Sequence, residues 1–296
     1  GGTRKASNYD HLFYSVNNVF MLLALILVLY PLIYVVSASF SAPGAVSSGQ
    51  VILWPVDFSL RGYKAIFDYE QVWTGYRNTL FYTVAGTALN LFMTLICAFA
   101  LSRKTVPGVR VFTKIFAFTM IFSGGLIPTY LLIDRLGLIN KPLVMIVPGA
   151  ISVYNMVIAR TFIQNNIPAD IYEAAQVDGC SDFRYFGVIV LPLSKAVLAV
   201  LGLFYAVGHW NAYFNALIYL TSKSLFPLQL FLREILVMNQ VDPNVLLDEE
   251  QRIAILGMQD LLKFSLIVVA TVPILCVYPF AQRYFIKGIM IGSLKG

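Results

Sequence analysis

The sequence predicts an all-α membrane protein with six transmembrane helices. Of its 296 residues, 58% are hydrophobic and only 12% are charged, and the mean hydropathy is +0.75. A soluble domain of this size is more polar. Apolar runs of about 18 to 25 residues recur, and at about 1.5 Å per residue each can cross a hydrocarbon layer of about 30 Å. The expected spans are 19–36, 78–101, 115–133, 142–159, 196–220 and 264–282, and none contains Asp, Glu, Lys or Arg.

The first span could also be a secretory signal peptide. Arg4 and Lys5 precede its apolar run, and Val36-Ser37-Ala38 could pass as a cleavage site. The run is longer than the usual h-region of about 7 to 15 residues, so a retained anchor is favoured. The expected organisation is a cytoplasmic N-terminal segment at 1–14, one transmembrane domain at 15–286 and a cytoplasmic tail at 287–296.

The third and fifth spans contain residues that interrupt helices. Gly124, Gly125 and Pro128 lie within the third span, and Gly202 and Gly208 lie within the fifth. In lipid, such breaks persist only where protein or a water-filled cavity satisfies the freed backbone groups. The pattern therefore favours a transport pathway over an inert anchor.

Basic residues predict the orientation, because cytoplasmic segments are enriched in Lys and Arg. The residues concerned are Arg4 and Lys5 near the N-terminus, Arg103, Lys104, Arg110 and Lys114 between spans two and three, and Arg283, Lys287 and Lys295 near the C-terminus. Both termini and the connection between spans four and five are expected in the cytoplasm, whereas 37–77, 134–141 and 221–263 face outward. The net charge of +6 follows from this topology and does not indicate nucleic-acid binding.

The chain carries no catalytic signature. It has no GxxxxGK[ST], HExxH or GxSxG motif, and its histidines are His11 and His209. Cys97, Cys180 and Cys276 are widely spaced and suggest neither a disulfide framework nor a metal site. We expect a protein that is not an enzyme by itself and binds no cofactor or metal. Ion-coupled carriers usually keep an ionisable side chain inside a span, so the energy for any uphill transport should come from a partner.

The segment 168–192 is unusually acidic for this chain. Its charged residues are the acids Asp170, Glu173, Asp178 and Asp182 and the base Arg184. Pro168-Ala169-Asp170 followed by Glu173 predicts a helix start in which Asp170 is the cap, with a capping-box-like partner three residues later. Gly179 predicts the helix end. The expected helix has about two turns and is roughly 12 Å long.

This predicted helix, 171–178, has one face with little side-chain bulk. Ile171, Ala174, Ala175 and Asp178 fall at i, i+3, i+4 and i+7, so another protein's backbone could approach closely. The alternative is a surface helix that lies on lipid. Anionic cytoplasmic lipids would repel its acids, and its apolar face is too small to anchor it. Docking of a protein is therefore favoured.

The same segment resembles a known signature. Glu173-Ala174-Ala175, then Gly179, then Ile189-x-Leu191-Pro192 match the spacing EAA-x3-G-x9-I-x-LP of membrane subunits of bacterial ABC importers. YNMVIARTFIQNNIPADIYEAA, LGLFYAVGHWNAYFNALIYL and AQRYFIKGIMIGSLKG are similar to the carbohydrate branch, in particular to the smaller subunit of a maltose-type pair. FSGGLIPTYLLIDRLGLIN and PLQLFLREIL resemble subunits of oligo- or polysaccharide importers, including those for alginate or aldouronates. The resemblance extends from about residue 15 to the end of the chain.

The resemblance implies the type I ABC importer permease fold with a short cytoplasmic coupling helix. The helix at 171–178, within a coupling loop at 164–185, would sit in a cleft of a cytoplasmic ATPase, and Gly179 would allow a sharp turn back toward the membrane. The residues implied in ATPase coupling are Glu173, Ala174, Ala175, Asp178 and Gly179. The tail at 287–296 would reach toward the ATPase; alternatively, it is a basic end that pairs with lipid headgroups.

The resemblance also implies partners and a location. Such importers combine a heterodimer of sister permease subunits with two ATP-binding cassette subunits, which bind ATP and Mg, and with an extracytoplasmic solute-binding protein that delivers the carbohydrate. ATP binding closes the ATPase dimer, and the spans rock between inward- and outward-facing states around a central cavity. The expected location is the bacterial cytoplasmic (inner) membrane, where the chain is a multi-pass protein in contact with lipid.

Polar residues recur along the fifth span. Gly208, Asn211, Asn215 and Tyr219 fall at i, i+3, i+7 and i+11, a stripe on one helix face that would be costly against lipid. Aromatic residues flank the stripe, and aromatic faces with amides suit sugar rings. The residues expected in the substrate pathway are Trp210, Asn211, Tyr213, Phe214, Asn215 and Tyr219. Alternatively, the amides hold helices together. His209 is expected to be a hydrogen-bonded interior residue rather than a proton relay.

Three functions remain open at this level: an ABC importer subunit, which the motif favours, an ATP-independent glycan channel or facilitator, and a membrane scaffold without a pathway. The favoured substrate is an oligo- or polysaccharide, which could be acidic. Because the spans carry no fixed cation, an anionic polymer could slide through without being trapped. The outward segment 221–263, with a turn signal at Asp242-Pro243-Asn244, is expected to be a partly helical cap that meets the binding protein.

Overall fold

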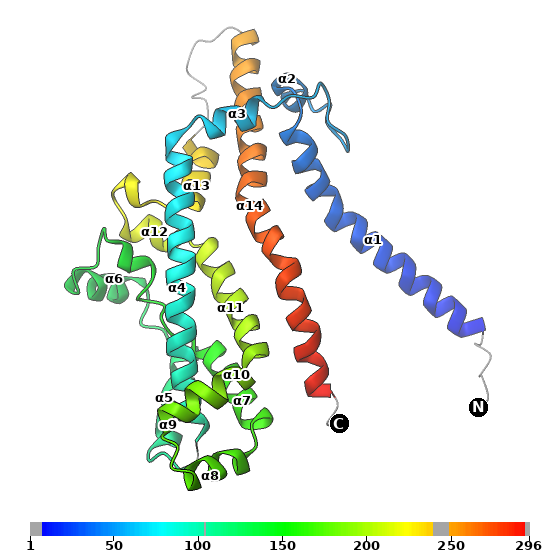
Figure 1. The fold of residues 1–296 in the computed structure, drawn as a ribbon. Coiled ribbons are helices and arrows are strands. Elements are labelled where there is room, and N and C mark those ends of the chain that lie inside the picture. Colours follow the sequence, from blue (N-terminus) through cyan, green and yellow to red (C-terminus); the bar gives the residue numbers. More distant parts are fainter. Residues whose placement is uncertain (1–7, 104, 239–248, 294–296) are drawn as a thin grey trace. The chain divides into compact units, whose positions relative to one another are not determined.

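The computed structural model describes residues 8–103, 105–238 and 249–293, and it describes side chains at 12–103, 105–235, 257–279 and 282. The regular structure in these ranges is helical and includes no strand, which confirms the predicted all-α class (Figure 1). The chain divides into two units, 1–69 with 234–271 and 70–233 with 272–296. The predicted turn at Asp242-Pro243-Asn244 lies outside the described residues, as do Arg4, Lys5, Lys104 and Lys295.

The first unit contains α1 and the short segments that follow it. Its helices are α1 (Asn8–Ser39), α2 (Pro43–Ser47), α3 (Arg61–Phe67) and the first part of α14 (Glu249–Ser293). Near the end of α1, Tyr34 meets Phe264 edge-to-face at 5.5 Å, and the Ser265 hydroxyl donates to the Ser39 carbonyl at 3.3 Å. The most apolar window of α1 is not buried by the chain itself. Such a helix is suited to contact with lipid or with another protein.

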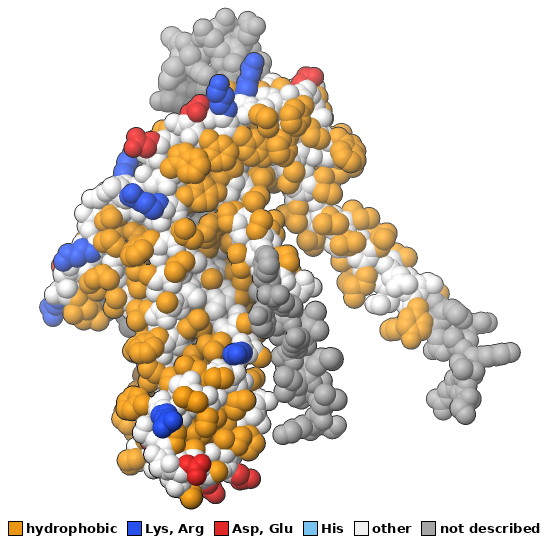
Figure 2. Space-filling view, viewed as in Figure 1, with side chains coloured by type: hydrophobic (Ala, Val, Ile, Leu, Met, Phe, Trp, Pro, Cys, Tyr) orange, Lys and Arg blue, Asp and Glu red, His pale blue; other side chains and the backbone are white. Residues whose placement is uncertain are grey.

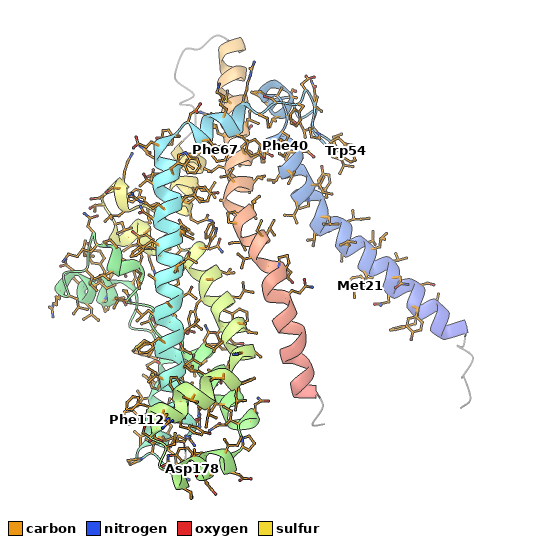
Figure 3. All side chains as sticks on the ribbon, viewed as in Figure 1. Met21, Phe40, Trp54, Phe67, Phe112 and Asp178 are labelled. Carbon is orange, nitrogen blue, oxygen red and sulfur yellow. The ribbon has the colours of Figure 1, made fainter. Side chains whose placement is uncertain are left out.

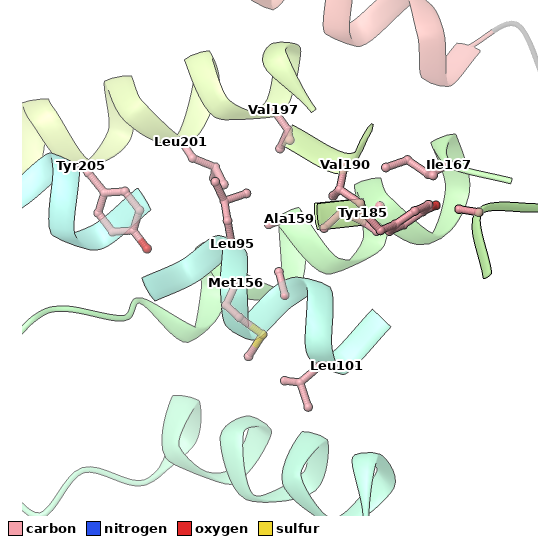
Figure 4. Packing of buried hydrophobic residues seen from close by; sticks show 13 residues of the cluster. Leu95, Leu101, Met156, Ala159, Ile167, Tyr185, Val190, Val197, Leu201 and Tyr205 are labelled. Carbon is pink, nitrogen blue, oxygen red and sulfur yellow. The ribbon is translucent and has the colours of Figure 1, made fainter. Parts of the chain in front are cut away.

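The second unit is built around α4 (Glu70–Ser102), which packs against α7 (Val153–Asn166) and α11 (Lys195–Trp210). Leu95, Met156 and Leu201 meet in the core between these helices (Figure 4). Small residues allow the close approach: a side chain at Gly86 of α4 would overlap the ring of His209. The His209 Nε2 lies 2.6 Å from the Asn90 Oδ1, which confirms that His209 is hydrogen-bonded within the chain, and its side chain is partly buried.

The third expected span is broken where the sequence predicts it. α5 (Val109–Ile121) and α6 (Leu126–Arg135) are separated by residues 122–125 and bend by 116° relative to each other. Gly125 has φ +89°, a conformation that glycine adopts at little steric cost. Pro128 does not end a helix, because it lies in the first turn of α6, where its missing N–H costs nothing.

The fourth expected span, 142–159, is not one helix. It consists of η1 (Pro142–Met145), a non-helical segment at 146–152, and the first half of α7. Pro148 and Gly149 disfavour a helix there, and side chains from neighbouring helices form hydrogen bonds with the backbone groups that a helix would have paired. The Asn90 amide donates to the Gly149 carbonyl at 2.5 Å, and the Ser152 N–H donates to the Tyr205 hydroxyl at 3.3 Å. The expectation of a continuous fourth span was therefore wrong.

The fifth expected span is interrupted at a different place from the predicted one. α11 runs through both Gly202 and Gly208, and the chain leaves the helix only at residues 211–213, before α12 (Phe214–Tyr219). A Cβ at Gly202 would make an ordinary contact with Leu91 at 3.6 Å, so the helix has room for a side chain there. The prediction that these glycines break the span was wrong. At its other end, α11 bends by 81° from the segment that precedes it, 182–193.

Segment 221–263, which is expected to face outward, is partly helical where the structure describes it. It contains η3 (Lys223–Leu225), α13 (Leu228–Met238) and the start of α14, and α14 continues through the sixth expected span to Ser293 without a break at 287. The Asn78 amide donates to the Ser224 and Phe226 carbonyls at 2.7 and 3.0 Å, which fixes the end of η3 against α4. Residues 224–226 are thus attached to α4.

The apolar surface fits a membrane protein. In the part of the chain that the structure describes, three single helices are long and apolar enough to cross a membrane, at 12–39, 70–102 and 257–279, and each of the two bent pairs could form a further span. In the second unit, hydrophobic side chains cover much of the visible lateral surface, and acidic side chains gather at the end that carries α8 (Figure 2). The six-span count itself stays a prediction.

Candidate functional site

The predicted coupling loop forms one end of the second unit. It consists of α8 (Ala169–Val177) and α9 (Asp182–Tyr185), which follow α7, and Asp178 lies near the tip (Figure 3). The start of α8 differs from the prediction. Its N-cap is Pro168, which makes no side-chain cap bond, and Asp170 lies within the first turn. The capping-box prediction was therefore wrong. Pro168 instead fixes an extended backbone before the helix, and the Asp170 charge favours the helix N-terminus from inside the turn.

The end of α8 matches the prediction. Gly179 has φ +73°, its N–H donates to the Gln176 carbonyl at 3.0 Å, and the Cys180 N–H donates to the Ala175 carbonyl at 2.9 Å. These two bonds form a Schellman motif, which satisfies the last carbonyls of the helix and reverses the chain. Glycine is favoured at this position because other L-residues pay a steric cost at positive φ. The helix therefore ends at Gly179 in a sharp turn, as predicted.

The predicted small face of α8 contains both buried and exposed residues. Ala175 is only 8% exposed and packs into the main core, whereas Ile171, Ala174 and Asp178 remain exposed. Glu173 is also exposed. The expectation that Ala175 belongs to the docking face was wrong: this alanine is small because α8 packs there against its own chain.

Two exposed apolar side chains at the loop were missed by the sequence analysis. Val177 is 88% exposed and Phe183 is 90% exposed, beside the acidic residues of the loop. The sequence offered two signals: Val177 lies two residues before Gly179, and Phe183 lies between the charged residues Asp182 and Arg184. Exposed apolar groups among polar ones mark interaction surfaces. We call Ile171, Ala174, Val177, Asp178 and Phe183 the coupling surface.

A polar contact holds the two short helices of the loop together. The Tyr172 hydroxyl of α8 donates to the Asp182 carboxylate of α9 at 2.9 Å. The hydrogen bond to Asp182 raises the pKa of Tyr172 above its ordinary value, with smaller effects in the same direction from burial and from the Asp182 charge. The phenol therefore stays protonated to higher pH than a free tyrosine does, and its hydrogen bond to Asp182 joins α8 to α9.

The predicted substrate stripe does not lie on one helix face. Asn211 is the C-cap of α11, its amide donates to the Val207 carbonyl at 2.9 Å, and its Oδ1 lies 3.5 Å from the Gln229 Nε2. Because the helix ends there, Asn211 and Asn215 belong to different helices and the predicted i, i+7 periodicity fails. Tyr213 and Phe214 lie between them and are both exposed. We call residues 211–215 the fifth-span break.

Two of the six predicted pathway residues are packed inside the chain. Trp210 is 8% exposed and meets the Tyr76 ring at 6.4 Å, and Tyr219 is 4% exposed and stacks on Tyr130 at 5.9 Å. Their aromatic faces are therefore used by neighbouring side chains. The four exposed residues of the break are the ones that remain available to a substrate, and this role stays a prediction.

The part of the chain that the structure describes contains no group of three or more His, Cys, Asp or Glu side chains that could hold a metal ion.

Comparison with known proteins identifies the family. No family model matches the chain. The polygalacturonan/rhamnogalacturonan transport system permease protein YtcP of Bacillus subtilis is 38% identical over 288 residues, which cover 97% of this chain and 98% of YtcP. The chain belongs to the permeases of carbohydrate ABC transporters. The resemblance seen in the EAA segment is thereby confirmed.

More distant relatives and a solved structure agree. The diacetylchitobiose uptake system permease protein NgcG of Streptomyces coelicolor is 25% identical over 310 residues, which cover 99% of the permease described here and 92% of NgcG. A chain from the crystal structure of a bacterial ABC transporter involved in the import of the acidic polysaccharide alginate is 34% identical, with a TM-score of 0.86. The match covers 96% of this permease and the whole of that chain. The fold of this permease is therefore that of an ABC importer permease.

Proposed function

We propose that this permease forms, with a sister subunit, the pathway for an acidic oligo- or polysaccharide in an ATP-driven importer. The relative of 38% identity is named for polygalacturonan and rhamnogalacturonan, and the solved structure belongs to an alginate importer. Both are associated with glycans that carry carboxylates. The proposal extends this shared chemistry to the present chain.

The coupling loop is the feature that supports docking of an ATPase. α8 ends in a Schellman turn at Gly179, and Val177 and Phe183 stand exposed beside it, so the loop offers an apolar surface with an acidic edge. An ATPase cleft with apolar walls and basic residues at its rim would be complementary to it. In this proposal two ATP-binding cassette subunits bind ATP and Mg and hydrolyse the nucleotide, while a solute-binding protein delivers the glycan on the opposite side.

The fifth-span break is the feature that supports a pathway for the glycan. It presents two amides, from Asn211 and Asn215, with the exposed rings of Tyr213 and Phe214, and the Gln229 amide lies next to Asn211. Amides can donate to and accept from sugar hydroxyls, and they can donate to a carboxylate, without holding it as a fixed cation would. Aromatic faces can cover the apolar side of a pyranose ring. This combination suits a chain of sugar units that must move on.

Reconstitution with defined partners tests the proposal. The purified permease is combined with its sister subunit, ATPase subunits and binding protein in proteoliposomes, and ATP hydrolysis is measured with alginate or polygalacturonate oligosaccharides. We expect these to stimulate hydrolysis and neutral maltodextrins of equal length not to do so. Stimulation by maltodextrins alone would contradict the acidic substrate. Glycan uptake without ATP would instead support a facilitator.

Cysteine labelling tests the proposed orientation, with the coupling loop and both termini in the cytoplasm of a bacterial cell. After replacement of Cys97, Cys180 and Cys276, a single cysteine is introduced at Ser181 in the coupling loop or at Ser48 after α2; Ser48 is exposed and Ser181 lies in the exposed loop. An impermeant thiol reagent should label the first position only from inside and the second only from outside. The reverse pattern would overturn the topology and the docking proposal together.

A further inference from the structure

Arg103, directly after α4, is enclosed by aromatic rings of the coupling loop. Its guanidinium carbon lies 3.4 Å from the ring centroid of Tyr172 on α8 and 4.8 Å from that of Tyr185 on α9. The ring centroid of Phe99 on α4 also lies 4.8 Å from this carbon. We call Arg103, Phe99, Tyr172 and Tyr185 the arginine cage. The cage joins the end of the central membrane helix to both helices of the loop.

The cage holds Arg103 through ring faces and leaves one of its donors unused. The Nη2 atom is buried and has no hydrogen-bond partner among the described residues. A buried donor without an acceptor is costly, so the compensating interaction here is the attraction of the cation to the aromatic faces. Ring faces impose weaker directional demands than hydrogen bonds do. The contact can therefore persist while the rings change their orientation toward the guanidinium.

Capping of α4 does not explain Arg103. The last carbonyls of α4 are already served by α7, because Arg160 Nε donates to the Leu101 carbonyl at 3.0 Å and Gln164 Nε2 donates to the Ser102 carbonyl at 3.3 Å. Among the described residues, the Arg103 guanidinium makes no hydrogen bond to these carbonyls. Its contacts run instead to the loop, which indicates a role between α4 and the loop.

Direct contacts hold the loop side of the cage together. Tyr172 and Tyr185 meet edge-to-face at 5.1 Å, the Tyr172 hydroxyl is bonded to Asp182, and Tyr185 is 1% exposed. A cavity of about 520 Å³ borders the cage and is lined by Glu173 and Gln164 among others, so α8 has space for displacement. A displacement of α8 would carry the rings with it and pull on the guanidinium.

We propose that Arg103 is the positioning residue that transmits the movement of α8 to α4. α4 has 33 residues, about 50 Å at 1.5 Å per residue, and it packs against both α7 and α11. A pull on its inner end therefore acts on the whole helix core that surrounds the pathway. This inference rests on the proposed function, since it assigns a part in coupling ATP hydrolysis to transport.

The first test compares Arg103→Gln with Arg110→Gln in the reconstituted complex. Arg110 is an exposed arginine of the same connection and lies outside the cage, so its variant controls for the lost charge. For Arg103→Gln we expect ATP hydrolysis without glycan to be retained, and glycan uptake per ATP hydrolysed to fall about fivefold or more, as for a typical coupling energy. The Arg110→Gln complex should match the wild type. An unchanged uptake-to-ATP ratio in Arg103→Gln would overturn the proposal.

A second pair of variants tests the role of the arginine cage even if the complex with Arg103→Gln fails to assemble. Tyr172→Phe keeps the ring and removes the bond to Asp182, whereas Tyr172→Leu removes the ring face. Uncoupling in Tyr172→Leu but not in Tyr172→Phe supports the cage, and equal behaviour of the two contradicts it. Where both single variants assemble, adding Tyr172→Leu to Arg103→Gln should cause little further loss, because both remove the same contact.

The wild-type complex separates this inference from the proposed function. If wild type shows no glycan-stimulated hydrolysis, the proposed function fails. If wild type and Arg110→Gln are stimulated but Arg103→Gln keeps normal coupling, only the role of Arg103 fails.

Discussion

The coupling loop and the fifth-span break are both turns between helices, but different contacts hold them. In the coupling loop the bonds close within a few residues: Gly179 to Gln176, Cys180 to Ala175, and Arg184 N–H to the Ser181 hydroxyl. At the break, Asn211 also bonds locally to the Val207 carbonyl, but its Oδ1 pairs in addition with Gln229, which is 18 residues away. A little further on, the Asn140 N–H donates to the Tyr219 carbonyl at 2.8 Å from another part of the chain.

This difference suggests how each turn can be changed. A turn held by local bonds keeps its shape while the whole loop moves as a piece, which suits a docking element. A turn held by remote side chains depends on the helices around it and changes when they rearrange, which suits a pathway that opens and closes. Variants in the first region should therefore affect coupling, and variants in the second should affect passage of the substrate.

The largest effect is expected for Gly179→Val. A β-branched residue at φ +73° is strained by roughly 1–2 kcal/mol or more, so the Schellman turn should be lost and uptake should fall at least about tenfold. Gly179→Asn is the matched control, because Asn tolerates the left-handed conformation better. Uptake and ATP hydrolysis are measured for complexes matched in permease content. Equal uptake by the Val and Asn variants would show that the turn does not control coupling.

The next effect concerns the exposed apolar groups of the coupling surface. Val177→Ser with Phe183→Ser removes side chains that are 88% and 90% exposed, so the free energy of unfolding of the permease should hardly change. If the ATPase covers them, about 1.5–3 kcal/mol per side chain is lost from docking, and ATPase retention on the immobilised permease should fall more than tenfold. Val106→Ser on the neighbouring connection is the control. Normal retention by the double variant would remove these residues from the interface.

A smaller effect is expected at the break, where Asn211→Ala is combined with Asn215→Ala. Each lost amide removes hydrogen bonds worth about 1 kcal/mol to a sugar, so uptake should fall severalfold while the complex assembles normally. Uptake in ATP-loaded proteoliposomes is compared with assembly by size-exclusion chromatography. Normal uptake would remove both residues from the pathway. Disassembly of the complex would instead favour the alternative in which the amides hold helices together.

The smallest effect is expected for Tyr219→Phe. Tyr219 is 4% exposed and stacked on Tyr130, so loss of its hydroxyl should change uptake by less than about twofold. Tyr213→Phe, at a ring that is 44% exposed on the break, is the comparison and should lower uptake more. Uptake of the same glycan is measured for both. A larger loss of uptake in Tyr219→Phe than in Tyr213→Phe would indicate that Tyr219 belongs to the substrate pathway. It would contradict the view that only the exposed residues of the fifth-span break are available to a substrate.

The success of sequence-based prediction follows this division only in part. Gly179, the EAA spacing and the Gly124-Gly125 break were found from the sequence because each depends on a few neighbouring residues. The capping of α8 failed for a local reason, since Pro168 occupies the cap position that the pattern assigned to Asp170. The polar stripe of the fifth span failed because the periodicity was extended through 211–213, where the helix ends.

The sequence by itself determined the membrane class, the family and the position of the coupling helix, because hydrophobic run length, charge distribution and a spaced motif are properties of the chain alone. Only the tertiary structure decided how 146–152 could leave the helix, since that depends on Asn90 and Tyr205 reaching Gly149 and Ser152. It also decided that Ala175 turns inward while Val177 and Phe183 turn outward. The arginine cage is of the same kind: Arg103 and Tyr172 are 69 positions apart, and no local pattern specifies which aromatic rings will meet a given cation.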